Sequence, residues 1–142
     1  MSRLPVAGVA AAGALGALAR YWLGEWLTAL VPADFPLATL IINLSGSALL
    51  GFVAGYGVER GRLPEAWRVP LAVGFVGSFT TFSTWAVDTV ALLAAGRRSL
   101  AVANVGLSLA LGFAAVWAGC AAGTRCSADS TRETTGTGPQ TD

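Results

Sequence analysis

Histidine is absent from this sequence of 142 residues, and charged side chains make up only 12% of it. Without histidine the chain lacks the commonest general base and the commonest metal ligand, which disfavours an enzyme or a side-chain metal centre. The formal net charge of +1 offers no basic surface for phosphates, so nucleic acid is not expected as a partner. The two cysteines, Cys120 and Cys126, form no CxxC pair and are predicted to be thiols without chemistry.

Long apolar runs stand where charge is missing, and 54% of the residues are hydrophobic. Four runs each exceed the ~20 residues needed to cross about 30 Å of hydrocarbon. They cover about residues 5–31, 36–58, 69–95 and 98–122. The first run is longer than the roughly 7–15 apolar residues of a signal peptide and is therefore predicted to be a spanning helix. We expect an all-α, multi-pass protein of the inner (plasma) membrane, with its transmembrane domain at residues 1–122.

The last segment, residues 123–142, is polar and rich in threonine, serine and glycine. It cannot bury enough apolar surface to fold, so a disordered tail is predicted. Four spans place both termini on one side of the membrane. That side would hold Arg3, Arg60, Arg62, Arg68, Arg125 and Arg132, whereas the other would hold Arg97, Arg98 and, near the end of the first span, Arg20. This modest excess favours cytoplasmic termini.

Small and polar residues recur at every fourth position in three of the spans, which places them on one face of each helix. The three stripes are Gly8, Ala12, Gly16 and Arg20; Thr39, Asn43, Ser47, Gly51 and Gly55; and Asn104, Ser108 and Gly112. The glycines indicate close helix packing. The hydroxyls and amides suit either hydrogen bonds between helices or an anion that must shed its water, because no stripe contains a carboxylate. The charge of Arg20 at membrane depth needs a partner, water or an anion.

The third span contains the segment GFVGSFTTFSTW at residues 74–85. Gly74 and Gly77, followed by Thr80 and Thr81, are weak helix formers, so a break at mid-membrane is predicted. Such a break is tolerated only where the freed carbonyls face protein or a cavity. Freed carbonyls near the bilayer centre can bind a small cation.

Continued to residue 89, as GFVGSFTTFSTWAVDT, this segment resembles the GFxGxxTTFSTF signature of the CrcB/Fluc fluoride-channel family. Three further stretches fit the family in the same order along the chain: GALGALARY (13–21), INLSGSALLGF (42–52) and SLALGFAAVWAG (108–119). The resemblance implies an antiparallel, dual-topology dimer of four-helix subunits. Two fluoride pathways would lie at the subunit interface, and a structural sodium ion that is not transported would lie at the dimer centre.

The resemblance also implies roles for individual residues. The carbonyls of Gly77 and Thr80 would hold the sodium, and Arg20 would make the vestibule electropositive. The fluoride pathway would include Asn43, Phe82, Trp85 and Ser108, with further donors from Thr39, Ser83, Thr84 and Asn104. Physical chemistry fits these roles, because amides and hydroxyls can replace the water of a small anion and an aromatic ring has a positive edge. The implied function is passive export of fluoride from the cytoplasm, which lowers its toxicity.

Two positions depart from the family pattern, and they leave alternatives open. Trp85 stands where the pattern has phenylalanine, and Asn104 stands where many members have an aromatic hydroxyl. Together with the arginine excess, they leave open a second possibility, a partner subunit that conducts only in a heterodimer with a paralogue. A small dual-topology multidrug transporter would need a glutamate deep in the first span, which offers only Glu25, late in the span.

Overall fold

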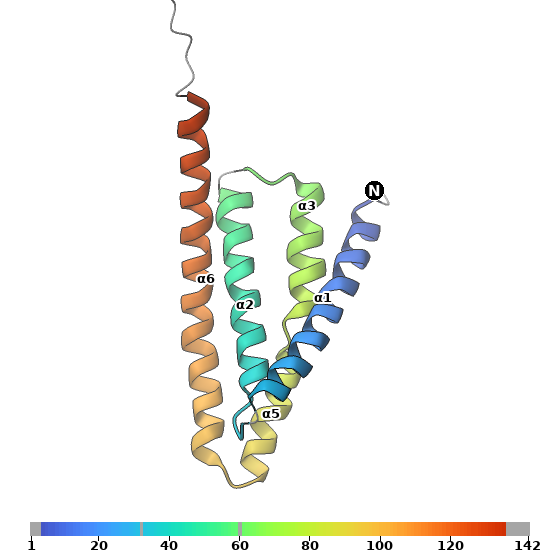
Figure 1. Ribbon diagram of the computed structural model, residues 1–142, viewed down its shortest axis with the longest axis vertical. Coiled ribbons are helices and arrows are strands. Elements are labelled where there is room, and N and C mark those ends of the chain that lie inside the picture. The colour runs from blue at the N-terminus through green and yellow to red at the C-terminus, as the bar shows by residue number, and fades with distance from the viewer. Residues whose placement is uncertain (1–3, 32, 60, 136–142) are drawn as a thin grey trace, which may run out of the picture.

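The chain folds into long helices that run alternately in opposite directions (Figure 1). The computed structural model describes residues 4–31, 33–59 and 61–135. The elements are α1 (Leu4–Leu30), α2 (Leu37–Val53), the π-helical η1 (Ala54–Glu59), α3 (Glu65–Val69), the π-helical η2 (Pro70–Val76), α4 (Gly77–Phe79), α5 (Phe82–Ala94) and α6 (Arg98–Thr135). These residues contain no strand. The predicted all-α fold is confirmed.

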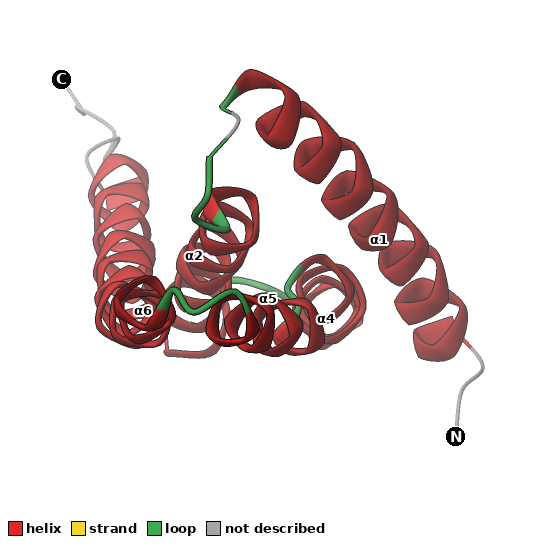
Figure 2. Ribbon diagram, turned by 90° about the horizontal axis from the view of Figure 1, so that it is seen from below, coloured by secondary structure: helices red, strands yellow, loops and turns green. Residues whose placement is uncertain are grey.

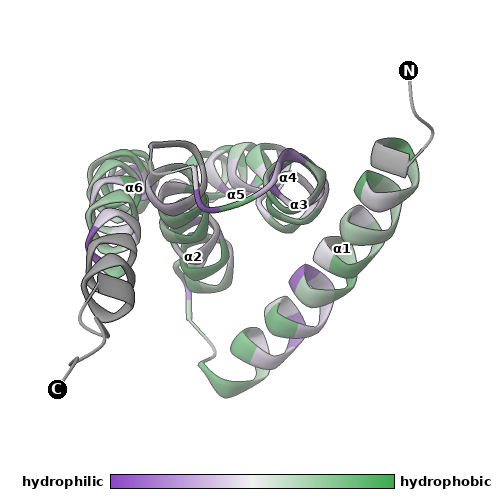
Figure 3. Cartoon of the chain, turned by 90° about the horizontal axis from the view of Figure 1, so that it is seen from above, coloured by the Kyte–Doolittle hydropathy of each residue, from purple (hydrophilic) through white to green (hydrophobic). Residues whose placement is uncertain are grey.

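Three helices are long and apolar enough to cross a membrane: Val6–Leu30, Leu37–Gly57 and Arg98–Cys126. The remaining pass is assembled from α3, η2, α4 and α5 in succession (Figure 1). Apolar colour covers the outward sides of the helices as well as the inward ones (Figure 3), and Phe113 and Trp117 are 76% and 75% exposed. Such a surface suits lipid and not water, so the protein is a multi-pass membrane protein.

Glycines bring α2 and the continuing η1 against α6. A Cβ added at Gly51 would collide with the carbonyl of Val116, and one at Gly55 with the carbonyl of Cys120. The contact is reciprocal, because a Cβ at Gly119 of α6 would collide with the carbonyl of Ala48 in α2. The four-residue glycine spacing of the second span thus packs helix against helix, as predicted.

Helix α1 crosses the others at a slant (Figures 1 and 2) and packs on η2 and α4. Gly16 lies against the backbone of Phe75, and a Cβ added at Gly13 would lie 3.2 Å from Ser78 Oγ. In return, a Cβ at Gly74 of η2 would lie 2.6 Å from the carbonyl oxygen of Val9. The first helix therefore supports η2 and α4, the part of the third pass that comes directly before Thr80 and Thr81.

Two connections meet at one end of the bundle. Arg97 Nη1 lies 2.7 Å from Asp34 Oδ2, which joins the α5–α6 turn to the α1–α2 connection. The neighbouring Gly96 has a φ of 74°, which glycine adopts without strain. Because the two charged side chains are 42% and 73% exposed, their ion pair contributes at most about 1 kcal/mol.

Helix α6 extends past the domain boundary predicted at residue 122 and continues to Thr135. The disorder predicted for residues 123–142 stays a prediction. Gly123 belongs to the packed region, since a Cβ there would lie 2.6 Å from the carbonyl oxygen of Phe52. Beyond it, each added residue continues an existing helix, which needs no new nucleus, and no proline interrupts the path. The rest of the predicted tail, residues 136–142, lies outside the described residues.

Candidate functional site at an interrupted helix

The third pass along the chain, made of α3, η2, α4 and α5, is interrupted at two threonines. Helix α4 ends at Phe79, Thr80 and Thr81 are extended (φ/ψ of −78°/157° and −146°/112°), and α5 begins at Phe82. The sequence placed the break within Gly77 to Thr80. The helix persists through Phe79, and the extended residues are the two threonines.

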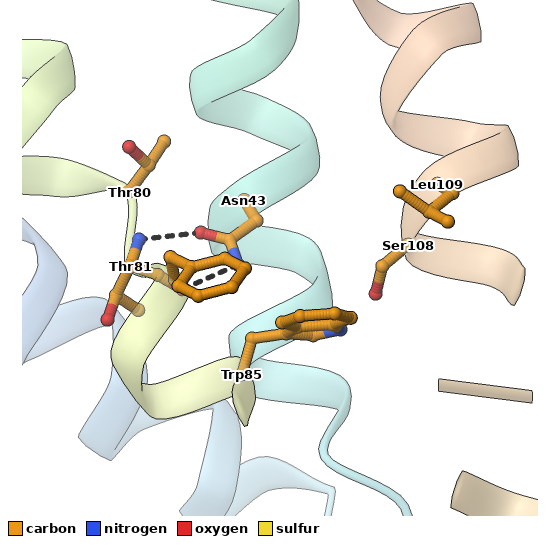
Figure 4. Close-up of a pocket in the computed structure, with 7 residues that line it drawn as sticks. Asn43, Thr80, Thr81, Trp85, Ser108 and Leu109 are labelled. Atoms are coloured by element: carbon orange, nitrogen blue, oxygen red, sulfur yellow. Dashed lines mark hydrogen bonds between the residues drawn. The ribbon is translucent and has the colours of Figure 1, made fainter. Parts of the chain in front are cut away.

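Asn43, reaching across from α2, binds both backbone groups of Thr81 (Figure 4). Its Oδ1 accepts from the Thr81 N–H at 2.8 Å, and its Nδ2 donates to the Thr81 carbonyl at 3.0 Å. In a continuous helix the Thr81 N–H would donate to the carbonyl of Gly77. The Asn43 amide replaces the helical partner of the Thr81 N–H and adds a donor to the Thr81 carbonyl, and so it holds the interruption open.

The hydroxyl residues of this segment, Thr80, Thr81, Ser83 and Thr84, mostly cap the two helix ends. Thr80 Oγ1 donates to the Val76 carbonyl at 3.0 Å. Thr81 Oγ1 accepts from the Thr84 N–H at 3.2 Å and donates to Thr84 Oγ1 at 2.9 Å, which makes Thr81 the N-cap of α5. Ser83 Oγ lies 3.3 Å from Thr81 Oγ1. Ser83 and Thr84 were predicted to face the fluoride pathway, but they surround the cap.

A cavity of about 270 Å³ lies beside the interruption, between α2, α5 and α6. It is lined by Asn43, Thr80, Thr81, Phe82, Trp85, Ser108 and Leu109 (Figure 4). The structure thus brings together five of the residues predicted for the site. The rings of Phe82 and Trp85 are 5.2 Å apart between centroids, and Phe82 is 77% exposed. Trp85 Nε1 and Ser108 Oγ are buried without a hydrogen-bond partner in the described part of the chain.

Thr39 lies elsewhere, in contact with a carboxylate. Its buried hydroxyl donates to Asp88 Oδ2 of α5 at 2.7 Å. Asp88 belongs to α5, so the polar stripe of the second span contains no carboxylate of its own but binds one from the neighbouring helix. The two residues are 49 positions apart in the sequence, so no local pattern predicts their contact. Asp88 does lie one helical turn from Thr84 and Trp85.

Asn104 is fully buried and joins α6 to α5 without lining the cavity. Its Nδ2 donates to Thr89 Oγ1 at 2.9 Å, and Thr89 Oγ1 donates to the Trp85 carbonyl at 2.8 Å. Asn104 Oδ1 has no partner in the described residues. Sequence reasoning missed Thr89, whose only signal is its position one turn after Trp85.

The remaining predicted residues lie outside the cavity lining. Arg20, on α1, has a buried Nε without a partner in the described chain. Gly77 is exposed, and the nearest atom to an added Cβ is the Ala72 carbonyl oxygen at 4.0 Å. No cluster of three or more His, Cys, Asp or Glu occurs in the described residues, so side chains of these types form no metal site there. The Gly77 carbonyl has lost its usual donor, and such oxygens fit a small hard cation.

Fold and site together define a class: multi-pass helical membrane proteins with an interrupted helix beside a mostly apolar cavity that a few polar groups enter, a construction that membrane transporters also use. The chain belongs to the CrcB-like family, and residues 7–120 match the family described as CrcB-like protein, Camphor Resistance (CrcB). The family membership predicted from four sequence stretches is confirmed.

Relatives of this family are similar over most of the chain. The fluoride-specific ion channel FluC 2 of Symbiobacterium thermophilum is 74% identical over 114 residues, which are 80% of this chain and 93% of that protein. FluC 1 of the same organism is 42% identical over 81% of this chain and 94% of its own length. FluC of Methylococcus capsulatus is 44% identical over 82% of this chain, which matches 51% of that longer protein.

Proposed function

We propose that this protein is a fluoride-specific channel through which fluoride leaves the cytoplasm passively. The observation that carries the proposal is the cavity at the interrupted helix, where two buried groups without partners, Trp85 Nε1 and Ser108 Oγ, meet the exposed ring of Phe82. None of the seven residues that line the cavity is acidic, which favours an anion. The names of the relatives support fluoride as that anion.

Fluoride is small and strongly hydrated, so a narrow pathway must replace its water with hydrogen-bond donors. The indole N–H of Trp85, the hydroxyl of Ser108 and the second N–H of the Asn43 amide are available for this. The edge of the Phe82 ring adds a weakly positive surface at little desolvation cost. Nothing in this set requires energy input, so fluoride would follow its electrochemical gradient.

The cavity of one chain is half of a site in this proposal. Phe82 lines it and is nevertheless 77% exposed, so a second subunit would cover the open side. We assign that place to a second copy in the opposite membrane orientation, in the inner (plasma) membrane, with two pathways at the interface. A paralogous subunit is the alternative, because Symbiobacterium thermophilum has both a FluC 1 and a FluC 2.

A structural sodium ion, which is not transported, completes the proposal. The carbonyls of Gly77 and Thr80 would hold it at the dimer centre. Two observations support this fit: the Thr81 N–H donates to Asn43 and not to the Gly77 carbonyl, and no side chain crowds Gly77. When bound, the ion would supply a fixed positive charge that favours an anion nearby in a medium of low dielectric constant.

The purified chain, reconstituted alone into fluoride-loaded liposomes, should release fluoride when valinomycin balances the charge with potassium. A fluoride electrode outside the liposomes records the release, and chloride-loaded liposomes with a chloride electrode serve as the control. Fluoride release without chloride release is the expected result. If the chain alone releases none but releases fluoride with a paralogous subunit, the homodimer is wrong and the heterodimer holds. If neither preparation releases fluoride, the protein is not a fluoride channel.

Removing sodium should also stop the flux if the ion is structural. Purification and reconstitution in sodium-free potassium salts, which keep the valinomycin assay working, should lower fluoride release to the level of empty liposomes, and sodium added back should restore it. Because a ligand that binds only the folded state stabilises it, the melting temperature in detergent should rise with sodium concentration. Full flux in sodium-free buffer would refute the sodium site and leave the channel standing.

A further inference from the structure

We propose that Trp85 determines how the cavity holds its anion, through a hydrogen bond from the indole N–H that acts together with the hydroxyl of Ser108. A phenylalanine, which the family pattern has at this position, offers only a ring edge. This inference rests on the proposed fluoride function and names the group that contacts the anion. It also makes this chain chemically different from a channel with two phenylalanines at the site.

The indole N–H of Trp85 lacks a partner in a place where water does not reach it. The atom is buried, and no acceptor within the described residues binds it. The indole N–H can only donate, and a buried donor left unpaired destabilises a protein. Its ring is held beside Phe82, with 5.2 Å between centroids and a tilt of 41°. The donor is therefore fixed at the cavity and needs an acceptor that the chain does not supply.

Ser108 provides a second donor from another helix. Its Oγ is also buried and unpaired in the described chain, although a serine within a helix often donates to the carbonyl four residues earlier. Figure 4 shows its hydroxyl directed toward the Trp85 indole across the cavity. Two donors converging from α5 and α6, with no acidic side chain in the lining, fit one small anion.

Asn104 positions this pair and does not contact the anion. Its Nδ2 donates to Thr89, and Thr89 donates to the Trp85 carbonyl, which fixes the direction of the amide. Asn104 precedes Ser108 by one turn of α6, and Thr89 follows Trp85 by one turn of α5. The buried link therefore sets the distance between the Trp85 and Ser108 donors. Both departures from the family pattern belong to one arrangement.

The experiment uses the full chain in detergent with ¹⁵N-labelled indoles, titrated with sodium fluoride and, separately, with sodium chloride. The indole proton of Trp85 should move downfield and saturate with fluoride, but not with chloride. The other tryptophans are internal controls because they are exposed: Trp22 68%, Trp26 59%, Trp67 72% and Trp117 75%. Loss of one resonance in Trp85→Phe assigns the signal. If that variant does not fold, Trp→Phe changes at the four controls assign it by elimination.

Two variants test the arrangement itself. Ser108→Ala should weaken the fluoride affinity read at the Trp85 indole by about tenfold or more, because a hydrogen bond to a charged group is lost. Asn104→Ala should also weaken it, and should shift the Trp85 indole resonance even without fluoride, since the positioning link is gone. A role of Asn104 in stability alone would lower the melting temperature and leave the affinity unchanged.

The results separate the role of Trp85 from the proposed fluoride channel, so that each can fail without the other. If the wild-type chain conducts fluoride but the Trp85 indole does not respond, Trp85 is not a ligand and the channel stands. An equal response to chloride also overturns the inference. A saturable fluoride response without flux in any preparation keeps the binding site and refutes the channel. If the chain shows neither an indole response nor fluoride flux, both the inference and the channel are refuted.

Discussion

Asn43→Ala should reduce fluoride flux to the level of empty liposomes. The variant removes both hydrogen bonds to Thr81, a residue that is 9% exposed. An unpaired buried backbone N–H costs about 1–3 kcal/mol, and the Thr81 N–H is left in that state. The extended segment would then lose the side chain that binds its backbone from α2, and the Thr81 N–H would be free to return to the Gly77 carbonyl. The cavity would close or change shape.

The matched control is Ser45→Ala on the same helix. Ser45 Oγ donates to the Ile42 carbonyl of its own helix, at 2.9 Å, and the residue does not line the cavity. This variant should conduct like the wild type. Thermal unfolding in detergent shows whether each variant is folded before its flux is compared. Wild-type flux in Asn43→Ala would mean that the interruption does not depend on this amide.

Much of the fold could be predicted because its determinants are local. Apolar runs and glycines at every fourth position need no knowledge of distant residues, and they predicted the helices and close packing at Gly51 and Gly55, which the structure shows to be against α6. The interruption is different. Glycines and threonines weaken a helix over several residues, but the exact position is chosen by Asn43, which lies 38 residues from Thr81. The end of α6 was missed because continuing a helix needs no packed partner.

The sequence predicted which residues belong to the candidate site. The role of each residue was harder to predict. Periodicity places Thr39 and Asn104 on inward faces, and both are buried. It cannot tell whether a donor is already paired. Thr39 binds Asp88 and Asn104 binds Thr89, both through partners on α5 that no spacing rule identifies. By contrast, the predicted Trp85 and Ser108 line the cavity and remain unpaired in the described chain.

Gly119→Ala should destabilise the protein, although alanine is the better helix former by about 1 kcal/mol. The added Cβ would collide with the Ala48 carbonyl and lie 3.0 Å from the Phe52 nitrogen, both in the backbone of α2. Backbone atoms cannot turn aside, so α2 and α6 would have to separate. Overpacking of this kind costs roughly 1–3 kcal/mol. Because α2 holds Asn43 and α6 holds Ser108, the same separation should widen the cavity and lower fluoride flux.

Gly106→Ala is the matched control, since no atom of the described chain lies within 4 Å of a Cβ added there. The same chemical change on the same helix should leave the melting temperature unchanged or raise it slightly, because only helix propensity is altered. Gly51→Ala, on the other side of the contact, should act in the same direction as Gly119→Ala, because its Cβ would collide with the Val116 carbonyl. Equal melting temperatures for the Gly119 and Gly106 variants would mean that α2 and α6 do not pack this closely. The width of the cavity would then not depend on the glycine contact between α2 and α6.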